Sequence, residues 1–93
     1  MRLKITEVES DLESDISDFA KIRGWFECKF ISPALRGVTD RLFIRRGRVI
    51  FLEVKKLGEE PTPQQLFRHR EMRSFGAEVF WVDNLEDARR ILR

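Results

Sequence analysis

Three charged residues stand where a β-sheet protein seldom places charge unless it is paired or functional. Glu53 and Lys55 lie within an apolar run, residues 48–56, that has the composition of a buried strand. Because they are two positions apart on a strand, their side chains point to the same face of the sheet. Asp40 closes the stretch that begins at Gly37 and opens another predicted strand. The pattern is therefore an acid at the start of one strand and Glu-x-Lys inside the next.

These residue types are the ones that hydrolysis of a phosphodiester requires. A divalent cation neutralises charge on the phosphate and lowers the pKa of a bound water. Mg²⁺ takes oxygen ligands, usually one or two carboxylates together with waters. We therefore expect Asp40 and Glu53 to be the carboxylate ligands, joined by the main-chain carbonyl of Val54. Lys55 would supply a cation that orients the water and stabilises the developing charge.

A hairpin is expected to bring the two acids together. Residues 46–48 form a turn between two apolar runs, and Asp40 and Glu53 each lie about six or seven residues from it. The two acids should therefore pair across the hairpin. The residues alone also leave a purely structural interpretation open. In that interpretation Glu53 and Lys55 form an ion pair on an exposed edge strand, and Asp40 is a turn residue.

The elements that position these residues follow from turn signals and hydrophobic spacing. The predicted order is a helix over 7–23, strands over 25–31, 41–46 and 48–56, a helix over 63–75 capped by Thr62, a strand over 78–82, and a last helix capped by Asp83 or Asn84. This order, αβββαβα, predicts an α/β sandwich with a central mixed four-stranded sheet. An antiparallel hairpin is followed by a crossover to a parallel strand.

The size and composition of the chain fit one domain. A chain of 93 residues buries a thin core, so a single domain over residues 1–93 and association into dimers are expected. The net charge of +2 is compatible with nucleic acid without identifying it as a partner. A single cysteine excludes an internal disulfide. No signal peptide and no membrane-length apolar run are apparent, so the cytoplasm, without membrane attachment, is the expected compartment.

Together these motifs resemble the virus-type replication-repair nuclease (VRR-NUC) family, a branch of the PD-(D/E)XK superfamily. The resemblance extends from about Glu13 to Asp87 and rests on Glu13, Gly37-Val38-Thr39-Asp40, Phe51-Leu52-Glu53-Val54-Lys55, Pro61-Thr62-Pro63-Gln64-Gln65 and Gly76. It implies a restriction-endonuclease-like sandwich and a nuclease that uses Mg²⁺ or Mn²⁺ and no organic cofactor. Stand-alone members look like homodimers similar to junction-resolving enzymes, which implies a branched DNA substrate.

The resemblance assigns roles residue by residue. Asp40 and Glu53 match the metal-binding acids, and Lys55 matches the catalytic lysine. Gln65 matches the glutamine on the helix that follows the site, and Glu13 matches the acid on the first helix.

Three positions in this match carry a competing interpretation or a departure. Glu13 is preferred over Glu9 as the helical acid because Thr6-x-x-Glu9 reads as a capping box, which gives Glu9 a structural role. Gln65 also completes a capping box with Thr62, and we expect that its amide cannot cap the helix and reach the site at once. Thr39 stands where the family more often has proline, which makes the turn less rigid but removes no ligand.

The basic residues near the predicted site are candidate phosphate contacts. Those predicted to bind nucleic acid are Lys29, Arg36, Arg41 and Lys56. His69, one turn after Gln65, is expected to be half-buried or solvated, with a general base as the alternative. Cys28 alternates with Phe26 and Phe30 and is expected in the core.

The functional prediction is a metal-dependent DNA endonuclease that acts as a homodimer on branched or junction DNA. Its setting would be replication, repair or recombination in a bacterial or phage-infected cell. Two alternatives stay open: a non-catalytic nucleic-acid-binding or assembly module, in which Glu53 and Lys55 are a structural pair, and an RNA-cutting enzyme of the same fold.

Overall fold

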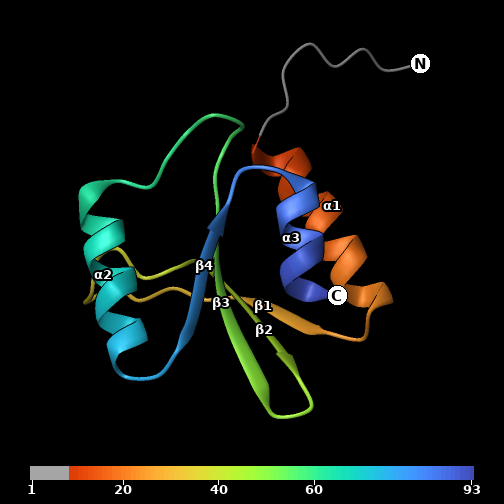
Figure 1. The fold of residues 1–93 in the computed structure, drawn as a ribbon, viewed down its shortest axis with the longest axis horizontal. Helices are drawn as coiled ribbons and strands as arrows, with labels where there is room; N and C mark the ends of the chain where they lie inside the picture. The colour runs from red at the N-terminus through yellow and green to blue at the C-terminus, as the bar shows by residue number, and fades with distance from the viewer. Residues whose placement is uncertain (1–8) are drawn as a thin grey trace.

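The structure, a computed structural model, describes residues 9–93, which form a four-stranded sheet packed between helices (Figure 1). The elements in chain order are α1 (Glu9–Ile22), β1 (Phe26–Lys29), β2 (Arg41–Arg45), β3 (Arg48–Val54), α2 (Pro63–Ser74), β4 (Glu78–Val82) and α3 (Leu85–Leu92). This order confirms the predicted αβββαβα sandwich. Within residues 9–93, no helix has the length and apolar character needed to cross a membrane.

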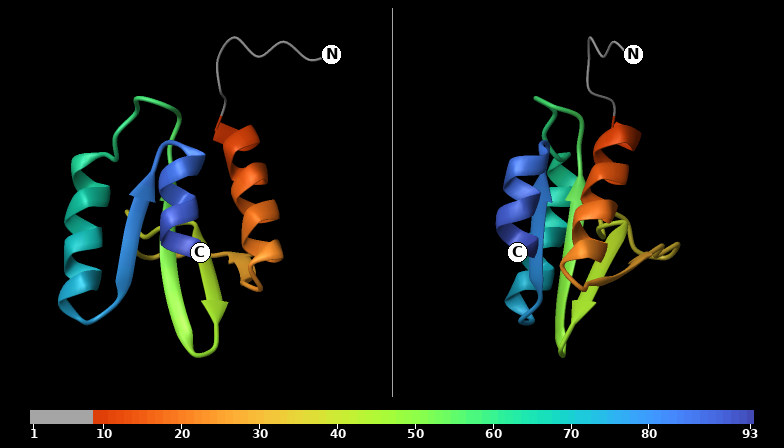
Figure 2. Two further views of the ribbon diagram at one scale, coloured as in Figure 1. Left: turned by 45° about the vertical axis from the view of Figure 1, so that its right-hand side comes forward. Right: turned by 90° about the vertical axis from the view of Figure 1, so that its right-hand side faces the viewer.

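The sheet is mixed, as the sequence predicts. Its strand order is β1-β2-β3-β4, with antiparallel pairing among the first three strands and parallel pairing between β3 and β4. Figure 1 shows α2 on one side of the sheet and α1 with α3 on the other. Figure 2 shows α1 and α3 lying next to each other, in agreement with their packing contacts.

The main core lies between the sheet and the α1–α3 layer. Alternate residues of β3, namely Ile50, Leu52 and Val54, are fully buried there, as period-two alternation requires. Phe43 of β2 joins them, together with the apolar stripe of α1 at Leu12, Ile16 and Ala20. The intervening residues of β3, which include Glu53, face the other side of the sheet, where α2 packs.

The edge strand β1 faces opposite to the prediction. Glu27, paired with core-facing Phe43, points toward α1 and accepts a hydrogen bond from Ser17 Oγ at 2.9 Å. Phe26 is 61% exposed, and Cys28 is half-buried and outside the main core. The prediction that these two residues face the core is therefore wrong. Their side of the sheet belongs to the α2 layer, and α2 packs on β4, far from β1.

The β2–β3 hairpin is confirmed and closes with a two-residue turn. Arg45 pairs with Arg48, and the two residues between them, Arg46 and Gly47, have φ angles of 50° and 81°. Positive φ at both central positions is the type I′ geometry, whose twist matches that of the flanking strands. This tight turn fixes the register of β2 against β3.

Most of the predicted element boundaries agree with the structure to within one or two residues. Thr62 is the N-cap of α2 with Pro63 at its first position, and Asn84 caps α3. β3 ends at Val54 rather than at Lys56, although the amide of Lys55 still donates to a β4 carbonyl at 2.8 Å. The capping box predicted for α1 begins at Thr6, which lies outside the described residues.

Candidate active site

Asp40 and Glu53 lie side by side at one end of the sheet. The β2–β3 register pairs Arg41 with Leu52, and one further step places Asp40 opposite Glu53. The main-chain oxygen of Asp40 accepts a hydrogen bond from the amide of Phe30 at 2.9 Å, which extends the β1–β2 pairing to this point. The pairing deduced from the position of the turn therefore agrees with the observed register.

Glu53 is a buried carboxylate that lies close to a hydrogen-bond donor and to a positively charged amine. The residue is 6% exposed and lies on the side of the sheet that α2 covers. Gln65 Nε2 donates a hydrogen bond to Glu53 Oε2 at 3.3 Å, and Lys55 Nζ lies 3.9 Å from the same oxygen. Burial of a carboxylate is costly unless such partners compensate it.

Gln65 both caps α2 and contacts Glu53. Its side-chain oxygen accepts a hydrogen bond from the amide of Thr62 at 2.9 Å, while its own amide donates to Thr62 Oγ1 at 3.1 Å. The side-chain nitrogen remains available for Glu53, because a carboxamide carries an acceptor and donors on different atoms. The expectation that capping and reaching the site exclude each other is wrong.

The carboxyl of Asp40 is poorly compensated. Its Oδ1 atom is buried and has no hydrogen-bond partner among the described residues. Burial raises the pKa of Asp40, and the charge of Glu13 raises it further. Arg41, a backbone hydrogen bond and Lys29 lower this pKa, but the net shift is upward from 3.8. A cation beside Asp40 would stabilise its charged form.

Glu13 reaches this region through Arg41. Arg41 Nη2 donates to Glu13 Oε1 at 2.7 Å, and Arg41 Nη1 donates to Glu27 Oε2 at 2.8 Å. Glu13 thus influences the pKa of Asp40, but its direct partner is a guanidinium. Glu27 belongs to this network and was not predicted, because the expectation that Cys28 faces the core implies that its neighbour Glu27 points outward. The guanidinium of Arg41, a predicted nucleic-acid contact, is already engaged by two carboxylates.

The other predicted nucleic-acid contacts are exposed. Lys29 lies at the end of β1, close enough to Asp40 for its charge to lower the pKa of that acid. Arg36 lies in the β1–β2 loop, where its main-chain oxygen accepts a hydrogen bond from Arg68 Nε at 2.9 Å. Lys56 follows β3. The side chains of Lys29, Arg36 and Lys56 are therefore accessible to a ligand.

A glycine holds the loop before Asp40 against α2. Gly37 has a φ of +85°, and a Cβ at this position would lie 2.8 Å from the main-chain oxygen of Gln64 and 3.0 Å from Arg68 Cβ. Only glycine combines this φ with so close an approach. The loop that delivers Asp40 is thus packed on the first turns of the helix that delivers Gln65.

His69 is fully buried beneath the site, so the expectation of a half-buried or solvated histidine is wrong. Neither ring nitrogen has a hydrogen-bond partner among the described residues. Burial lowers the pKa of His69 below 6.5, and the charges of Arg73 and Lys55 lower it further. The imidazole is therefore neutral at neutral pH. The sequence offered no signal for this burial, because α2 has little apolar patterning.

The donor set fits a hard cation with few protein ligands. Among residues 9–93, no group of three or more His, Cys, Asp or Glu side chains is arranged to hold a metal. A site made of two carboxylates, a main-chain carbonyl and waters does not need a third such side chain, and Mg²⁺ commonly keeps several waters. The buried Asp40 Oδ1 without a partner, next to buried Glu53, suits such an ion.

Comparisons with known proteins point in one direction. No protein-family model matches the chain. A protein of Acyrthosiphon pisum secondary endosymbiont phage 1, named "Putative nuclease p44", is 43% identical over 70 residues, which are 74% of each chain. A solved structure described as "VRR_NUC domain" superposes with a TM-score of 0.81 at 27% identity, over 89% of this chain and 91% of the other. Another, "VRR_NUC domain protein", gives 0.75 at 17% identity over 92% and 85%, a likeness of fold.

Proposed function

The chain belongs to the VRR-NUC family of nucleases, and on that premise we propose that it is a metal-dependent DNA endonuclease that hydrolyses phosphodiester bonds. The observation that carries the proposal is the pairing of Asp40 with buried Glu53 across the β2–β3 register, with Lys55 Nζ 3.9 Å from Glu53. Two acids and a cation at one end of a sheet are the groups that metal-assisted hydrolysis requires.

In this proposal Asp40, Glu53 and the main-chain carbonyl of Val54 would hold Mg²⁺ or Mn²⁺. Such an ion, when bound there, would supply charge neutralisation on the phosphate and a lowered pKa for a bound water. The poorly compensated Asp40 carboxyl supports this role, because a bound cation would stabilise its charged form.

The remaining residues orient these groups. Lys55 places an ammonium beside Glu53, where it can donate a hydrogen bond to the attacking water or to the charge that develops on the phosphate. Gln65 fixes the carboxylate of Glu53 through its Nε2–H bond. Glu13 acts through its bond to Arg41 and through its effect on the pKa of Asp40.

We propose that residues 1–93 act as a single nuclease domain in replication, repair or recombination, on branched DNA in a bacterial or phage-infected cell. Nucleic acid would approach over the loops that carry Lys29, Arg36 and Lys56, whose exposed charges suit backbone phosphates. Arg41 would contribute at the edge of this surface.

We further propose a homodimer, with a second copy covering the apolar side of the sheet that α2 leaves open. Phe26, Ile44 and Val49 lie in one register row on this side and are 61%, 36% and 38% exposed. Beside them a mainly apolar groove of about 420 Å³ runs between Phe51 and Phe75. Soluble monomers seldom expose a continuous apolar surface of this kind. Twofold symmetry would give the dimer two active sites, one for each of two DNA strands.

The test of the catalytic proposal is cleavage of supercoiled and branched DNA by purified protein with Mg²⁺ or Mn²⁺. We expect cleavage by the wild type and a loss of roughly a hundredfold or more in Asp40→Asn and in Lys55→Ala, the scale seen when transition-state stabilisation is removed. Asp40→Asn should leave thermal stability unchanged or raised, because the raised pKa shows that the folded chain disfavours this charge.

Arg70→Gln is a matched control, since Arg70 is exposed on α2 and makes no hydrogen bond or ion pair among the described residues. Equal cutting by the wild type and both site variants would refute the catalytic proposal. Metal-independent DNA binding without cutting would instead support a non-catalytic module. The dimer is tested separately by sedimentation of Ile44→Glu, which should be monomeric, and a monomeric wild type would contradict it.

A further inference from the structure

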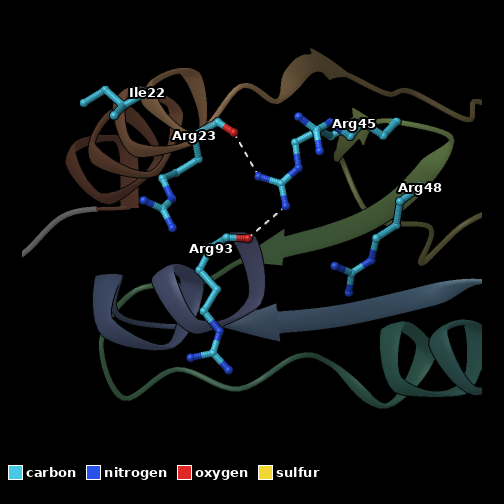
Figure 3. Close-up of a pocket in the computed structure, with 6 residues that line it drawn as sticks. Ile22, Arg23, Arg45, Arg48 and Arg93 are labelled. Carbon is cyan, nitrogen blue, oxygen red and sulfur yellow. Dashed lines mark hydrogen bonds between the residues drawn. The ribbon is translucent and has the colours of Figure 1, made fainter.

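A second basic region lies at the end of the sheet far from Glu53. The β2–β3 hairpin meets the C-terminal ends of α1 and α3 there and forms a pocket of about 590 Å³ (Figure 3). It is lined by Ile22 and by five arginines, Arg23, Arg45, Arg46, Arg48 and Arg93. We call these six residues the arginine pocket.

Two of the five arginines have structural partners. Arg45 donates to the main-chain oxygens of Arg23 and Arg93, each at 2.9 Å, and its guanidinium lies 4.3 Å from the centre of the buried Trp25 ring. Figure 3 shows Arg45 between these two chain segments. Arg48 forms a two-pronged ion pair with Glu78 at 2.8 Å. Helix capping and ion pairing therefore account for Arg45 and Arg48.

The other three arginines are not accounted for in this way. Arg23, Arg46 and Arg93 are exposed, and within residues 9–93 their guanidinium groups make no hydrogen bond or ion pair, although that of Arg23 lies 5.8 Å from the centre of the Phe19 ring. Cations are favoured near helix C-termini, which explains a net preference for arginine there. That preference does not explain why three further guanidinium groups line the same pocket, because Arg45 already caps both helix ends.

Arg46 adds an independent observation. It is the sole non-glycine residue with positive φ among the described residues, at 50°. The first position of a type I′ turn favours asparagine, aspartate or glycine, so arginine there is conformationally unfavourable. When an exposed turn keeps a residue that is unfavourable there, a function of that side chain is indicated.

We propose that the arginine pocket binds a backbone phosphate of the nucleic-acid substrate, remote from the phosphate that is cut. Guanidinium groups suit phosphate because their N–H groups bond two oxygens at once. Arg48 precedes Glu53 by five residues of β3, a separation of about 17 Å along the strand, and the two side chains leave opposite faces of the sheet. This phosphate is therefore distinct from the scissile one, and the pocket extends the proposed nuclease function to a flanking segment of the duplex.

The test is the salt dependence of binding to a fluorescent DNA duplex, measured by anisotropy in EDTA so that no cutting occurs. Arg46→Asn removes the charge and suits the turn, so it should fold. We expect it to weaken binding roughly three- to tenfold and to lower the slope of log K against log salt by about one. Arg23→Gln with Arg46→Asn should lower the slope by about two.

The controls separate this site from the catalytic one. Arg46→Lys should restore the slope, and Arg70→Gln should leave it unchanged. In the cleavage assay, Arg46→Asn should raise KM and leave kcat at saturating DNA unaltered. An unchanged slope in the double variant, or an equal drop in Arg70→Gln, would overturn the proposal. Failure of the wild type to cut DNA would refute the nuclease function alone, because the slope still reports on the pocket.

Discussion

At its last residues β3 buries Glu53 beside Lys55 and Gln65, whereas at its first residues it exposes Arg48 to solvent and to Glu78. The buried end contains few charges, and one carboxyl oxygen of Asp40 has no hydrogen-bond partner within residues 9–93. The exposed end contains many charges of one sign around an open hollow. In our proposals the two ends of the same strand therefore use charge differently, the buried end for catalysis and the exposed end for binding nucleic acid.

The difference has an energetic basis. Removing a charge from water is expensive, so buried charge persists only when partners or a ligand compensate it. Exposed arginines cost the fold little, and salt screens their mutual repulsion. We therefore expect substitutions at the Glu53 end to change reaction rate or packing, and substitutions at the hairpin end to change binding.

The largest loss of stability should follow substitution of a glycine near one of the two ends of β3. Gly37 and Gly47 have nearly equal φ angles, +85° and +81°, but only Gly37 has main-chain and side-chain atoms within reach of an added Cβ. Gly37→Ala should lower the free energy of unfolding by about 2–3 kcal/mol, and Gly47→Ala by about 1 kcal/mol, the backbone cost alone. Urea denaturation of both variants measures this, and equal losses would contradict the close packing of the loop on α2.

At the hairpin end, Arg45 is the residue whose loss should affect the fold. Arg45→Ala removes two hydrogen bonds to main-chain carbonyls and the contact with Trp25, and should cost about 1–2 kcal/mol. Arg46→Asn should cost nothing, since asparagine suits the turn. Thermal melts of the two variants would distinguish them, and a larger loss in Arg46→Asn would reverse the roles assigned here.

The two functions of Gln65 can be separated by substitution. Gln65→Glu keeps an oxygen for the cap but replaces the donor to Glu53 with a second carboxylate. Cleavage should fall about tenfold or more, because the new carboxylate repels Glu53, whereas the cap keeps its acceptor oxygen. Thr62→Ala should do the reverse, with a loss of about 1 kcal/mol in stability and a smaller effect on rate. If both variants lost rate and stability together, the two functions could not be separated.

The smallest effect should be a pH dependence from His69. Its pKa in the folded chain is below the ordinary value of 6.5, so the unfolded chain binds the proton more readily. The stability is therefore fully present above about pH 6.5 and is lost as the pH falls through the pKa of the folded state. Lys55, which directly follows β3, and Arg73 on α2 are the charges that act on this ring. Denaturation between pH 7.5 and 5.5 should show a weaker slope in His69→Asn than in the wild type, and equal slopes would exclude the histidine as the cause.

Turn and capping residues in the sequence correctly predicted the elements that depend on residues close together in the chain. The hairpin at Arg46 and Gly47 follows from turn residues between apolar runs, and it fixes the pairing of Asp40 with Glu53. Thr62 and Pro63 mark the start of α2 by capping chemistry. The fold and the register that places Asp40 opposite Glu53 were therefore accessible from the sequence.

Features that depend on tertiary coverage were not accessible. Whether Phe26 or Glu27 faces the core depends on which side of β1 a helix covers, and the alternation of apolar with charged residues in this strand pointed to the wrong side. His69 is buried because α2 lies across the sheet, which its weak apolar pattern does not signal. The double role of Gln65 arises only when the start of α2 meets β3.

The topology of the sheet also implies an order of assembly. β2 and β3 pair across a two-residue turn and β1 joins β2 across residues 30–40, so these contacts close smaller loops, at lower entropic cost, than the crossover to β4. β4 joins β3 only after the chain has passed through α2, a longer-range contact that closes later. We expect Asp40 and Glu53 to be registered by the early local pairings, whereas Gln65 arrives with the late crossover. The two acids would then come together before the helix that orients them has docked.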